Sequence, residues 1–278
     1  YLRMSMSDLT IDVNMYNLGT WIGAIWVEDY FRELTIERVR FTNSGGNIIR
    51  LMKSSVIADS IWDNMDGRAL STGWENKPDL RFRDNVIRNN MFIRTAAAPQ
   101  GPGINLSRAE NNIVIGNQVI NINRPDDSYG GIRVPNGSDN NLIEGNIVKN
   151  FPRGIWVMSG SQNNVVRENT VIDSWIVSIF INASHEDKRS TSGNVIANNV
   201  IIQENPLIGS ADLIRLHEDF SKTIFDNVVE GNEVRITSSY YNAYKQGKAL
   251  VDGIVYLTNG AEAPGRNLVR DNVLVITD

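Results

Sequence analysis

Polar and aliphatic positions follow one short pattern that recurs along the chain. The pattern reads Asn, two aliphatic residues, two variable residues and a second Asn. Seven copies are NVIRNN (85–90), NIVIGN (112–117), NLIEGN (141–146), NVVREN (164–169), NVIANN (194–199), NVVEGN (227–232) and NLVRDN (267–272). Their first asparagines follow one another after 27, 29, 23, 30, 33 and 40 residues, and a period of this length predicts a solenoid.

Two further apolar runs accompany most copies, and both predict short strands. One follows the motif directly, as in QVININ (118–123). The other alternates apolar with variable residues, as in GIRVPN (131–136) and DLIRLHE (212–218), which is the period of a strand buried on one side. Three short strands per repeat make one coil of a parallel β-helix, and we expect about eight to ten coils. A leucine-rich repeat needs a helical segment, and no regular helical pattern lies between the runs.

The repeated asparagines predict a sharp bend that recurs in every coil. Asn tolerates left-handed backbone angles at little cost, so we expect it at the bend between two strands. Successive coils lie ~4.8 Å apart, which lets identical side-chain amides hydrogen-bond up the stack. Gly116 and Gly231, each just before a second Asn, suit the same bend. These asparagines are therefore interpreted as structural.

With these repeats, the chain resembles the right-handed parallel β-helix of the pectate-lyase-like superfold over about residues 20–278. The resemblance implies an all-β fold with three short strands per coil. It also implies a secreted protein or one at a cell or virion surface. The superfold includes lyases, hydrolases, epimerases, fructan-transferring enzymes, tailspikes and adhesins, and the chain has no family-specific catalytic motif. The reaction therefore stays open.

Composition narrows the class of protein. Hydrophobic residues make up 41% of the 278 residues, enough for one β-helix domain over 1–278, which we expect to lack its first coils or an upstream domain. A net charge of −5 without a Lys/Arg run argues against a nucleic-acid partner. Cysteine is absent, which excludes disulfides and thiolate chemistry. No apolar stretch is long enough for a membrane span.

The alternating runs, stacked in register, place one outward residue of each coil in a single file. These residues are Trp26, Arg50, Asn105, Arg133, Trp156, Phe180, Arg215 and Tyr256, and Ser71 aligns less surely. Aromatic rings suit the C–H faces of sugars, and guanidinium groups bind carboxylates. Eight rungs make a strip roughly 35 Å long, which suits a polymer. The alternative is that the aromatic residues pack against long loops or a neighbouring subunit.

Several long loops are expected to wall this face, and one strand and one loop carry candidate chemistry. The loops are 124–130, 183–193, 205–211, 217–226 and 238–252. Arg215 and His217 lie two apart on one strand and face the same way, with Tyr256 one rung away and Glu218 at the start of a loop. Arg, His and Tyr suit β-elimination from an acidic sugar, in which a cation neutralises the carboxylate and the C5 proton is removed. Ordinary surface residues are the alternative.

A second candidate is the loop that holds Asp126 and Asp127, near Tyr129 and Arg133. Adjacent aspartates can bind Ca²⁺, which we treat as the one candidate cofactor, or can supply acid and base carboxylates. The same sequence, Pro-Asp-Asp-Ser-Tyr-Gly, is also typical of a plain turn. A hydrolase needs two carboxylates on the groove, and the candidates are Glu28, Asp127, Glu218, Asp219 and Asp252. No His-rich or Cys-rich metal motif is found.

Two hypotheses from different classes follow. The first is a polysaccharide lyase that acts on an acidic, uronate-containing glycan, with glycoside hydrolysis or fructan or glycan transfer as the alternative reaction. Its catalytic residues would be Arg215, His217, Tyr256, Asp127 and Arg133, and its substrate-binding residues Trp26, Arg50, Asn105, Trp156, Phe180 and Glu218. The second is a non-catalytic β-helix, such as a tailspike, an adhesin or a glycan-binding module, for which a homotrimer is one expected state.

Overall fold

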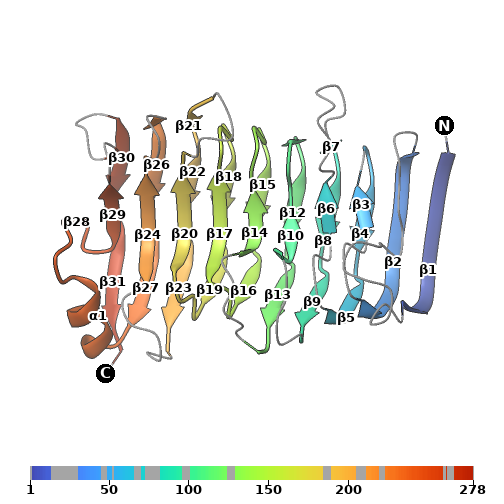
Figure 1. Cartoon of the computed structure of the whole chain (residues 1–278), viewed down its shortest axis with the longest axis horizontal. Coiled ribbons are helices and arrows are strands. Elements are labelled where there is room, and N and C mark those ends of the chain that lie inside the picture. Colours follow the sequence, from blue (N-terminus) through green and yellow to red (C-terminus); the bar gives the residue numbers. More distant parts are fainter. Residues whose placement is uncertain are drawn as a thin grey trace.

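The computed structural model of the chain is a solenoid of stacked coils, shown side on in Figure 1. It describes residues 2–13, 31–44, 49–51, 53–65, 70–72, 82–95, 101–123, 129–183, 189–204, 211–218, 223–258, 261 and 266–277. The right-handed parallel β-helix expected from the sequence is confirmed, because successive coils pair in parallel along the whole described chain. The predicted Trp26 and Asp127 lie outside the described residues.

Three stacks of strands, called face 1, face 2 and face 3, enclose the core. Face 1 holds β4 (Val56–Ala58), β8 (Val86–Arg88), β12 (Ile113–Ile115), β15 (Leu142–Glu144), β18 (Val165–Arg167), β22 (Val195–Ala197), β26 (Asn227–Glu230) and β30 (Asn267–Arg270). Face 2 holds β5 (Ile61–Met65), β9 (Met91–Arg94), β13 (Gln118–Asn121), β16 (Ile147–Lys149), β19 (Thr170–Ile172), β23 (Val200–Gln203), β27 (Glu233–Ile236) and β31 (Val273–Ile276).

Face 3 is a separate sheet. Its parallel strands are β3 (Ile49–Leu51), β6 (Leu70–Thr72), β10 (Ile104–Asn105), β14 (Gly130–Val134), β17 (Arg153–Met158), β20 (Val177–Asn182), β24 (Asp212–His217) and β29 (Val255–Thr258). These eight strands agree with the expected number of coils. At its last strand the sheet ends with β28 (Leu250–Val251), which pairs with β29 in the antiparallel sense.

The first strands and two small pairs complete the fold. β1 (Leu2–Asp12) pairs with β2 (Phe31–Ser44), and β2 in turn pairs with both β4 and β5. β2 therefore runs along both face 1 and face 2, whereas each later coil has a separate short strand on each face. This long strand joins the two faces into one sheet. β7 (Phe82–Arg83) pairs with β11 (Ala109–Glu110), and β21 (Thr191–Ser192) with β25 (Ile224–Phe225).

Two ladders of buried asparagines run along the edges of face 1. In the first, each Nδ2 donates to the Oδ1 of the next Asn at 2.7–2.9 Å. In the second the same bond measures 2.8–3.0 Å. The first ladder holds Asn85, Asn112, Asn141, Asn164, Asn194, Asn227 and Asn267, and the second Asn90, Asn117, Asn146, Asn169, Asn199, Asn232 and Asn272. The predicted stacking of amides is confirmed.

The left-handed bend lies one residue before the ladder asparagines, which confirms the expectation for Gly116 and Gly231 and corrects it for the asparagines themselves. Asn111 and Asn140, which precede ladder asparagines, have φ of 56°, and Gly116 has φ of 67°. The ladder residues have no positive φ, and their amides hydrogen-bond along the stack to the next coil. A Cβ at Gly116 would lie 2.7 Å from the Oδ1 of Asn89, so this glycine also provides room for the coil before it.

One segment predicted as a loop contains a helix. α1 (Ser238–Tyr244) begins after Thr237, whose side chain accepts a hydrogen bond from the Tyr240 backbone N–H at 3.3 Å. Tyr240 and Tyr244 are buried, and both hydroxyls donate to backbone carbonyls. Burial raises the pKa of both tyrosines above the ordinary value. Seven residues are too few to show a helical period, which explains the missed helix.

The core is a column of aliphatic side chains inside the tube. On face 1 the central residue of each strand points inward and is fully buried, as for Val114, Ile143 and Val166. Trp62 stacks between Phe41 and Phe92 near the first coils, with ring centroids 4.9 and 4.7 Å away. No helix within the described residues is long and apolar enough to cross a lipid bilayer.

Replacement of one ladder amide by a carboxylate tests the ladder. In Asn146→Asp an oxygen replaces the Nδ2 donor that now lies 2.9 Å from both Asn169 Oδ1 and the Val114 carbonyl. Because the site is fully buried, we expect a loss of about 3 kcal/mol in the free energy of unfolding. Asn140→Asp, at an exposed left-handed position, is the control and should cost less than about 0.5 kcal/mol in urea-unfolding curves. Equal losses would contradict the ladder's role.

Candidate functional site

The predicted outward file on face 3 is continuous from coil to coil. Backbone register pairs Arg50 with Ser71, Ser71 with Asn105 and Asn105 with Arg133. It then pairs Arg133 with Trp156, Trp156 with Phe180, Phe180 with Arg215 and Arg215 with Tyr256. The alignment made from the sequence is confirmed for the described part of the file, including the uncertain Ser71.

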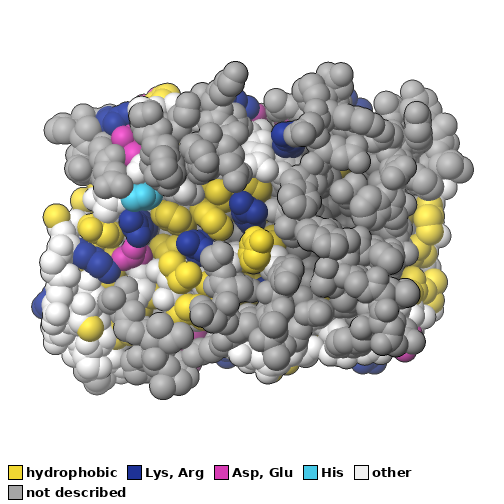
Figure 2. All heavy atoms as spheres, in the orientation of Figure 1, with side chains coloured by type: hydrophobic (Ala, Val, Ile, Leu, Met, Phe, Trp, Pro, Cys, Tyr) yellow, Lys and Arg dark blue, Asp and Glu magenta, His cyan; other side chains and the backbone are white. Residues whose placement is uncertain are grey.

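Five members of this file form what we call the Arg–aromatic strip: Arg133, Trp156, Phe180, Arg215 and Tyr256. Figure 2 shows basic and apolar side chains together in a hollow on this side of the molecule. Arg133, Trp156, Arg215 and Tyr256 are half-buried, and Phe180 is only 7% exposed. The side chains point out of the tube, yet their neighbours cover much of them.

Guanidinium groups cover the aromatic rings of the strip. Arg133 and Arg153 lie 5.0 and 4.4 Å from the Trp156 ring centroid. Arg153 and Arg215 lie 5.9 and 5.7 Å from that of Phe180, and Arg215 lies 5.6 Å from Tyr256. Trp156 and Phe180 also stack on each other, with centroids 5.8 Å apart. The rings therefore hold flat cations in place, and the arrangement favours recognition by the arginines over direct stacking of sugars on these two rings.

A second file runs beside the strip, two residues further along each strand. Register pairs Met158 with Asn182, Asn182 with His217 and His217 with Thr258. Asn182 Oδ1 accepts a hydrogen bond from Trp156 Nε1 at 2.7 Å. Polar groups of this file thus lie alongside the cations, and only His217 among them was singled out from the sequence.

The protonation of His217 follows from its contacts. Its Nδ1 lies 3.1 Å from Arg215 Nη2 and 2.7 Å from Thr258 Oγ1. A guanidinium has only donors, so Nδ1 is the acceptor in this contact and the ring proton is on Nε2. His217 is therefore assigned as an N–H donor at Nε2, in addition to the donors of the neighbouring arginine.

One buried carboxylate fixes two cations at the base of the strip. Asp212 Oδ2 accepts from Arg215 Nη1 at 3.2 Å, and its Oδ1 accepts from Lys248 Nζ at 2.7 Å. Lys248 also lies 5.6 Å from the Tyr256 ring centroid. Asp212 and Lys248 were not predicted as site residues, because they come from a strand start and from the segment after α1. The Asp-x-x-Arg spacing in β24 was the one signal for this pair in the sequence.

A pocket of about 260 Å³ opens between the two files. Its polar lining consists of Arg153, Asn182, Arg215 and His217, and Trp156 and Phe180 supply apolar walls. No carboxylate is among the described residues that line it. The pocket therefore offers hydrogen-bond donors and positive charge, a combination that suits a carboxylate or another oxyanion.

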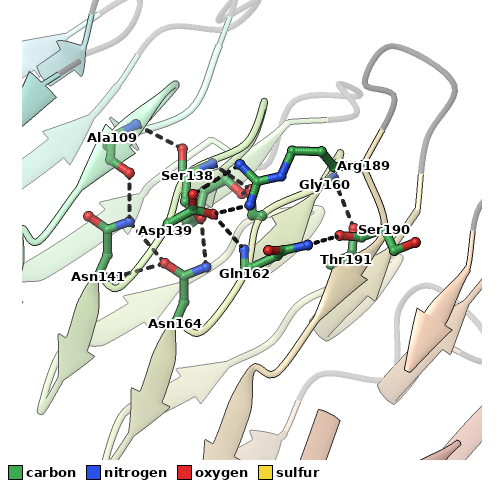
Figure 3. Close-up of polar contacts among 12 residues, drawn as sticks. Ala109, Ser138, Asp139, Asn141, Gly160, Gln162, Asn164, Arg189, Ser190 and Thr191 are labelled. Carbon is green, nitrogen blue, oxygen red and sulfur yellow. Dashed lines mark hydrogen bonds and ion pairs between the residues drawn. The ribbon is translucent and has the colours of Figure 1, made fainter. Parts of the chain in front are cut away.

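A polar network supports the Asn182 end of this pocket, and Figure 3 shows it in close-up. Arg189 binds both carboxylate oxygens of Asp139 at 3.0 Å, and the Gln162 backbone N–H donates to the same carboxylate. Thr191 Oγ1 donates to the Asn182 carbonyl at 3.1 Å and accepts from the Gly160 N–H. Residues 189–192 are thus tied to the coil beneath them, and the strand end that carries Asn182 is tied to them.

Three further candidates within the described residues, Asn105, Glu218 and Asp252, are not among the residues that line the pocket. Asn105 is buried in its file, 5% exposed. Glu218 forms an ion pair with Arg266 at 2.8 Å and accepts from the Ile224 N–H. Asp252 accepts two hydrogen bonds from Asn272 and ends the second ladder. The proposed roles of Arg50, Asn105 and Glu218 stay predictions, and Trp26 and Asp127 lie outside the described residues.

The chain is similar to one protein family in sequence and to solved β-helix proteins in structure. The family model described as "Periplasmic copper-binding protein (NosD)" matches residues 83–274. The A-module of the Azotobacter vinelandii mannuronan C-5 epimerase AlgE6 aligns with a TM-score of 0.61 at 18% identity, over 99% of this chain and 74% of the module. A search of curated protein sequences found no match.

A second solved structure is a mutant tailspike protein of E. coli bacteriophage HK620 in complex with a pentasaccharide. It aligns with a TM-score of 0.53 at 12% identity and covers 88% of this chain. The chain spans about half, 48%, of that tailspike. At these identities both structures show the shared parallel β-helix fold. The structural neighbours are thus β-helix proteins that act on or bind polysaccharides.

The side chains of the described site do not fit a copper centre. The described residues contain no cluster of three or more His, Cys, Asp or Glu side chains that could hold a metal ion. His217 Nδ1 accepts from Arg215, and Arg153 lines the same pocket. Met158 Sδ lies 3.3 Å from the guanidinium of Arg133. A cation placed here would be repelled by three arginines, so no step of the proposed chemistry is derived through copper.

Copper uptake can be measured directly to test this conclusion. We expect His217→Ala to retain as much Cu²⁺ as the unchanged protein after equilibrium dialysis and metal analysis, because the strip offers no set of metal ligands. His185→Ala, which removes the other histidine of the chain, serves as the paired variant. Loss of one equivalent of copper in His217→Ala alone would show a metal site on face 3.

Proposed function

We propose that this chain, which belongs to the NosD family, binds an acidic polysaccharide along the Arg–aromatic strip of face 3. The proposal rests mainly on the pocket, whose described lining has two arginines, a histidine and an asparagine and no carboxylate. The structural neighbours support a polysaccharide as the class of ligand. The family description supports a location in the periplasm, or otherwise outside the cytoplasm.

The strip is positively charged although the protein as a whole has a negative net charge, and it therefore favours an anionic ligand. The whole chain carries a net charge of −5, whereas Arg133, Arg153, Arg215 and Lys248 gather on one face. Asp212 is the carboxylate between them and offsets one charge. A local concentration of positive charge in a half-buried site attracts polyanions and orients them.

The arginines are held in place before a ligand binds. Each guanidinium of the strip lies against at least one aromatic ring, and Arg215 is also bound by Asp212. A guanidinium that is already ordered loses little side-chain entropy when a carboxylate binds its remaining N–H groups. The polar file with Asn182 and Thr258 lies beside it on the same strands and offers hydrogen-bonding groups that suit hydroxyls. The strip thus suits a sugar that has a carboxylate on one edge and hydroxyl groups on the other.

The catalytic form of the proposal is β-elimination. Arg153 and Arg215 bind the uronate carboxylate and stabilise the negative charge that develops when the C5 proton leaves. A water molecule takes that proton. The C5–H electron pair forms the C4–C5 double bond and the C4–O bond breaks. The O–H of Tyr256, one rung beyond Arg215, protonates the leaving oxygen, and His217 Nε2–H donates a hydrogen bond to it.

Hydrolysis is less well supported by the described carboxylates. A hydrolase needs a general acid and a base or nucleophile on the groove. Asp212 is bound by two cations and Glu218 by Arg266, while Asp252 ends the Asn ladder. These three described carboxylates are all engaged by other groups, so none of them is available to form such a pair. The elimination therefore stands ahead of glycosidic hydrolysis or transfer.

The binding proposal is tested with arginine variants. We expect Arg153→Ala and Arg215→Ala each to raise the Kd for a defined oligouronate about tenfold, because each removes a charge-assisted bond. Arg235→Ala removes an equal charge from face 2, where Arg235 pairs with Glu233, and serves as the matched control. Isothermal calorimetry against the acidic oligomer and its methyl ester gives the affinities. Equal losses in all three variants, or equal binding of the ester, would contradict the proposal.

The catalytic proposal is tested separately by ultraviolet absorbance of the unsaturated product during incubation with uronate polymers. We expect Tyr256→Phe to lower the rate at least about a hundredfold because it removes the proton donor, while the binding affinity is kept. His217→Ala should lower the rate about tenfold, because it removes a hydrogen-bond donor to the leaving oxygen. New reducing ends without absorbance would indicate hydrolysis. Binding without either signal would leave the polysaccharide-binding function and remove the elimination step.

A further inference from the structure

The outer side of face 1 carries an unbroken file of aliphatic side chains. Register places them one above another: Val56, Val86, Ile113, Leu142, Val165, Val195, Val228 and Leu268. Every member is at least partly exposed, and Ile113 and Leu268 are 38% and 47% exposed. A sheet face that is exposed only to water normally carries polar side chains. An aliphatic stripe of this kind therefore marks a surface for a partner.

A mostly charged file runs parallel to the aliphatic one on the same strands. From β4 to β30 it reads Ala58, Arg88, Ile115, Glu144, Arg167, Ala197, Glu230 and Arg270, and Glu37 of β2 precedes it. Within the chain Arg167 pairs with Glu144 at 2.7 Å, and Arg270 with Glu230 at 2.6 Å. The order of charges along this file decides which partner can pack against the face.

We propose that face 1 binds face 1 of a second copy of this chain, in a two-fold symmetric and antiparallel homodimer. A two-fold axis parallel to the strands, between β15 and β18, places the aliphatic file against the aliphatic file of the second copy. It reverses the order of the coils, so that β4 of one copy faces β30 of the other. The alternative two-fold axis, along the solenoid, would place aliphatic side chains against charged ones.

The charged file is complementary to itself in this arrangement. Reversal of its order places Arg88 opposite Glu230 and Glu144 opposite Arg167, each twice because the interface is isologous. Ile115 then faces Ala197. At the centre the two Glu144–Arg167 pairs form a ring of four alternating charges, and such a network stabilises more than isolated surface pairs do. A second copy is therefore the occupant that the pattern of face 1 selects.

The size of the face predicts a weak dimer. Eight rungs at ~4.8 Å and strands of three residues at ~3.3 Å give a face of roughly 300–400 Å² per copy. This area is below the ~800 Å² per partner of a standard stable interface, so association depends on concentration. Face 3 lies on a different side of the solenoid, and the dimer is therefore independent of the polysaccharide proposal.

Charge variants test the interface by sedimentation velocity over a wide concentration range. We expect a monomer–dimer equilibrium for the unchanged chain. Glu144→Arg and Arg167→Glu should each raise the dissociation constant about tenfold or more, because like charges then face each other twice. An equimolar mixture of the two variants should dimerise like the unchanged chain, since opposite charges face each other again. Circular dichroism verifies that each variant is folded.

Cross-linking tests the antiparallel order. The chain has no cysteine, so Arg88→Cys and Glu230→Cys introduce unique thiols. We expect a short bismaleimide to join the two variants when they are mixed and to leave Arg88→Cys alone as a monomer. A chain that stays monomeric at all concentrations, a trimeric mass, or self-cross-linking of Arg88→Cys would each overturn the proposal.

Discussion

The hydrogen bond between stacked asparagine amides is the interaction on which the rest of this molecule depends. Each ladder Oδ1 accepts both the Nδ2 and the backbone N–H of the preceding ladder residue, as Asn169 does for Asn146. A shift of one coil by a single residue would break these bonds in both ladders and leave buried amides without partners. The ladders thus fix the register of faces 1 and 2 directly. Because each coil also contributes a strand to face 3, the register of face 3 follows from theirs.

The candidate site is a product of this register. Arg133, Trp156, Phe180, Arg215 and Tyr256 come from five different coils, separated by 23 to 41 residues of sequence, and they contact one another because the coils lie in phase. The aromatic residues between them serve mainly to order the cations. A site of this type needs no precise loop conformation, because the sheet places each residue and its neighbours on adjacent strands hold it.

Much of the fold and part of the site were predictable from the sequence. The Asn motif and the period-two runs gave the parallel β-helix, and they gave the outward file as far as the structure describes it, since both follow from local patterns. Arg153, Asp212 and Lys248 escaped prediction because their roles depend on how strand ends and the segment after α1 fold back onto face 3. The position of the left-handed bend was wrong by one residue, because Asn suits both the bend and the ladder and the sequence does not separate these two demands.

The ladders also have a direction. Every Nδ2 points toward the next coil, so the side-chain amide dipoles add along the solenoid as peptide dipoles add along an α-helix. The positive end of the second ladder lies at Asn272, and there the carboxylate of Asp252 accepts both the Nδ2 and the backbone N–H. Asp252 is to the ladder what an acidic N-cap is to a helix. A further coil stacked on Asn272 would therefore have to displace this negative charge and supply its own acceptor for both N–H groups.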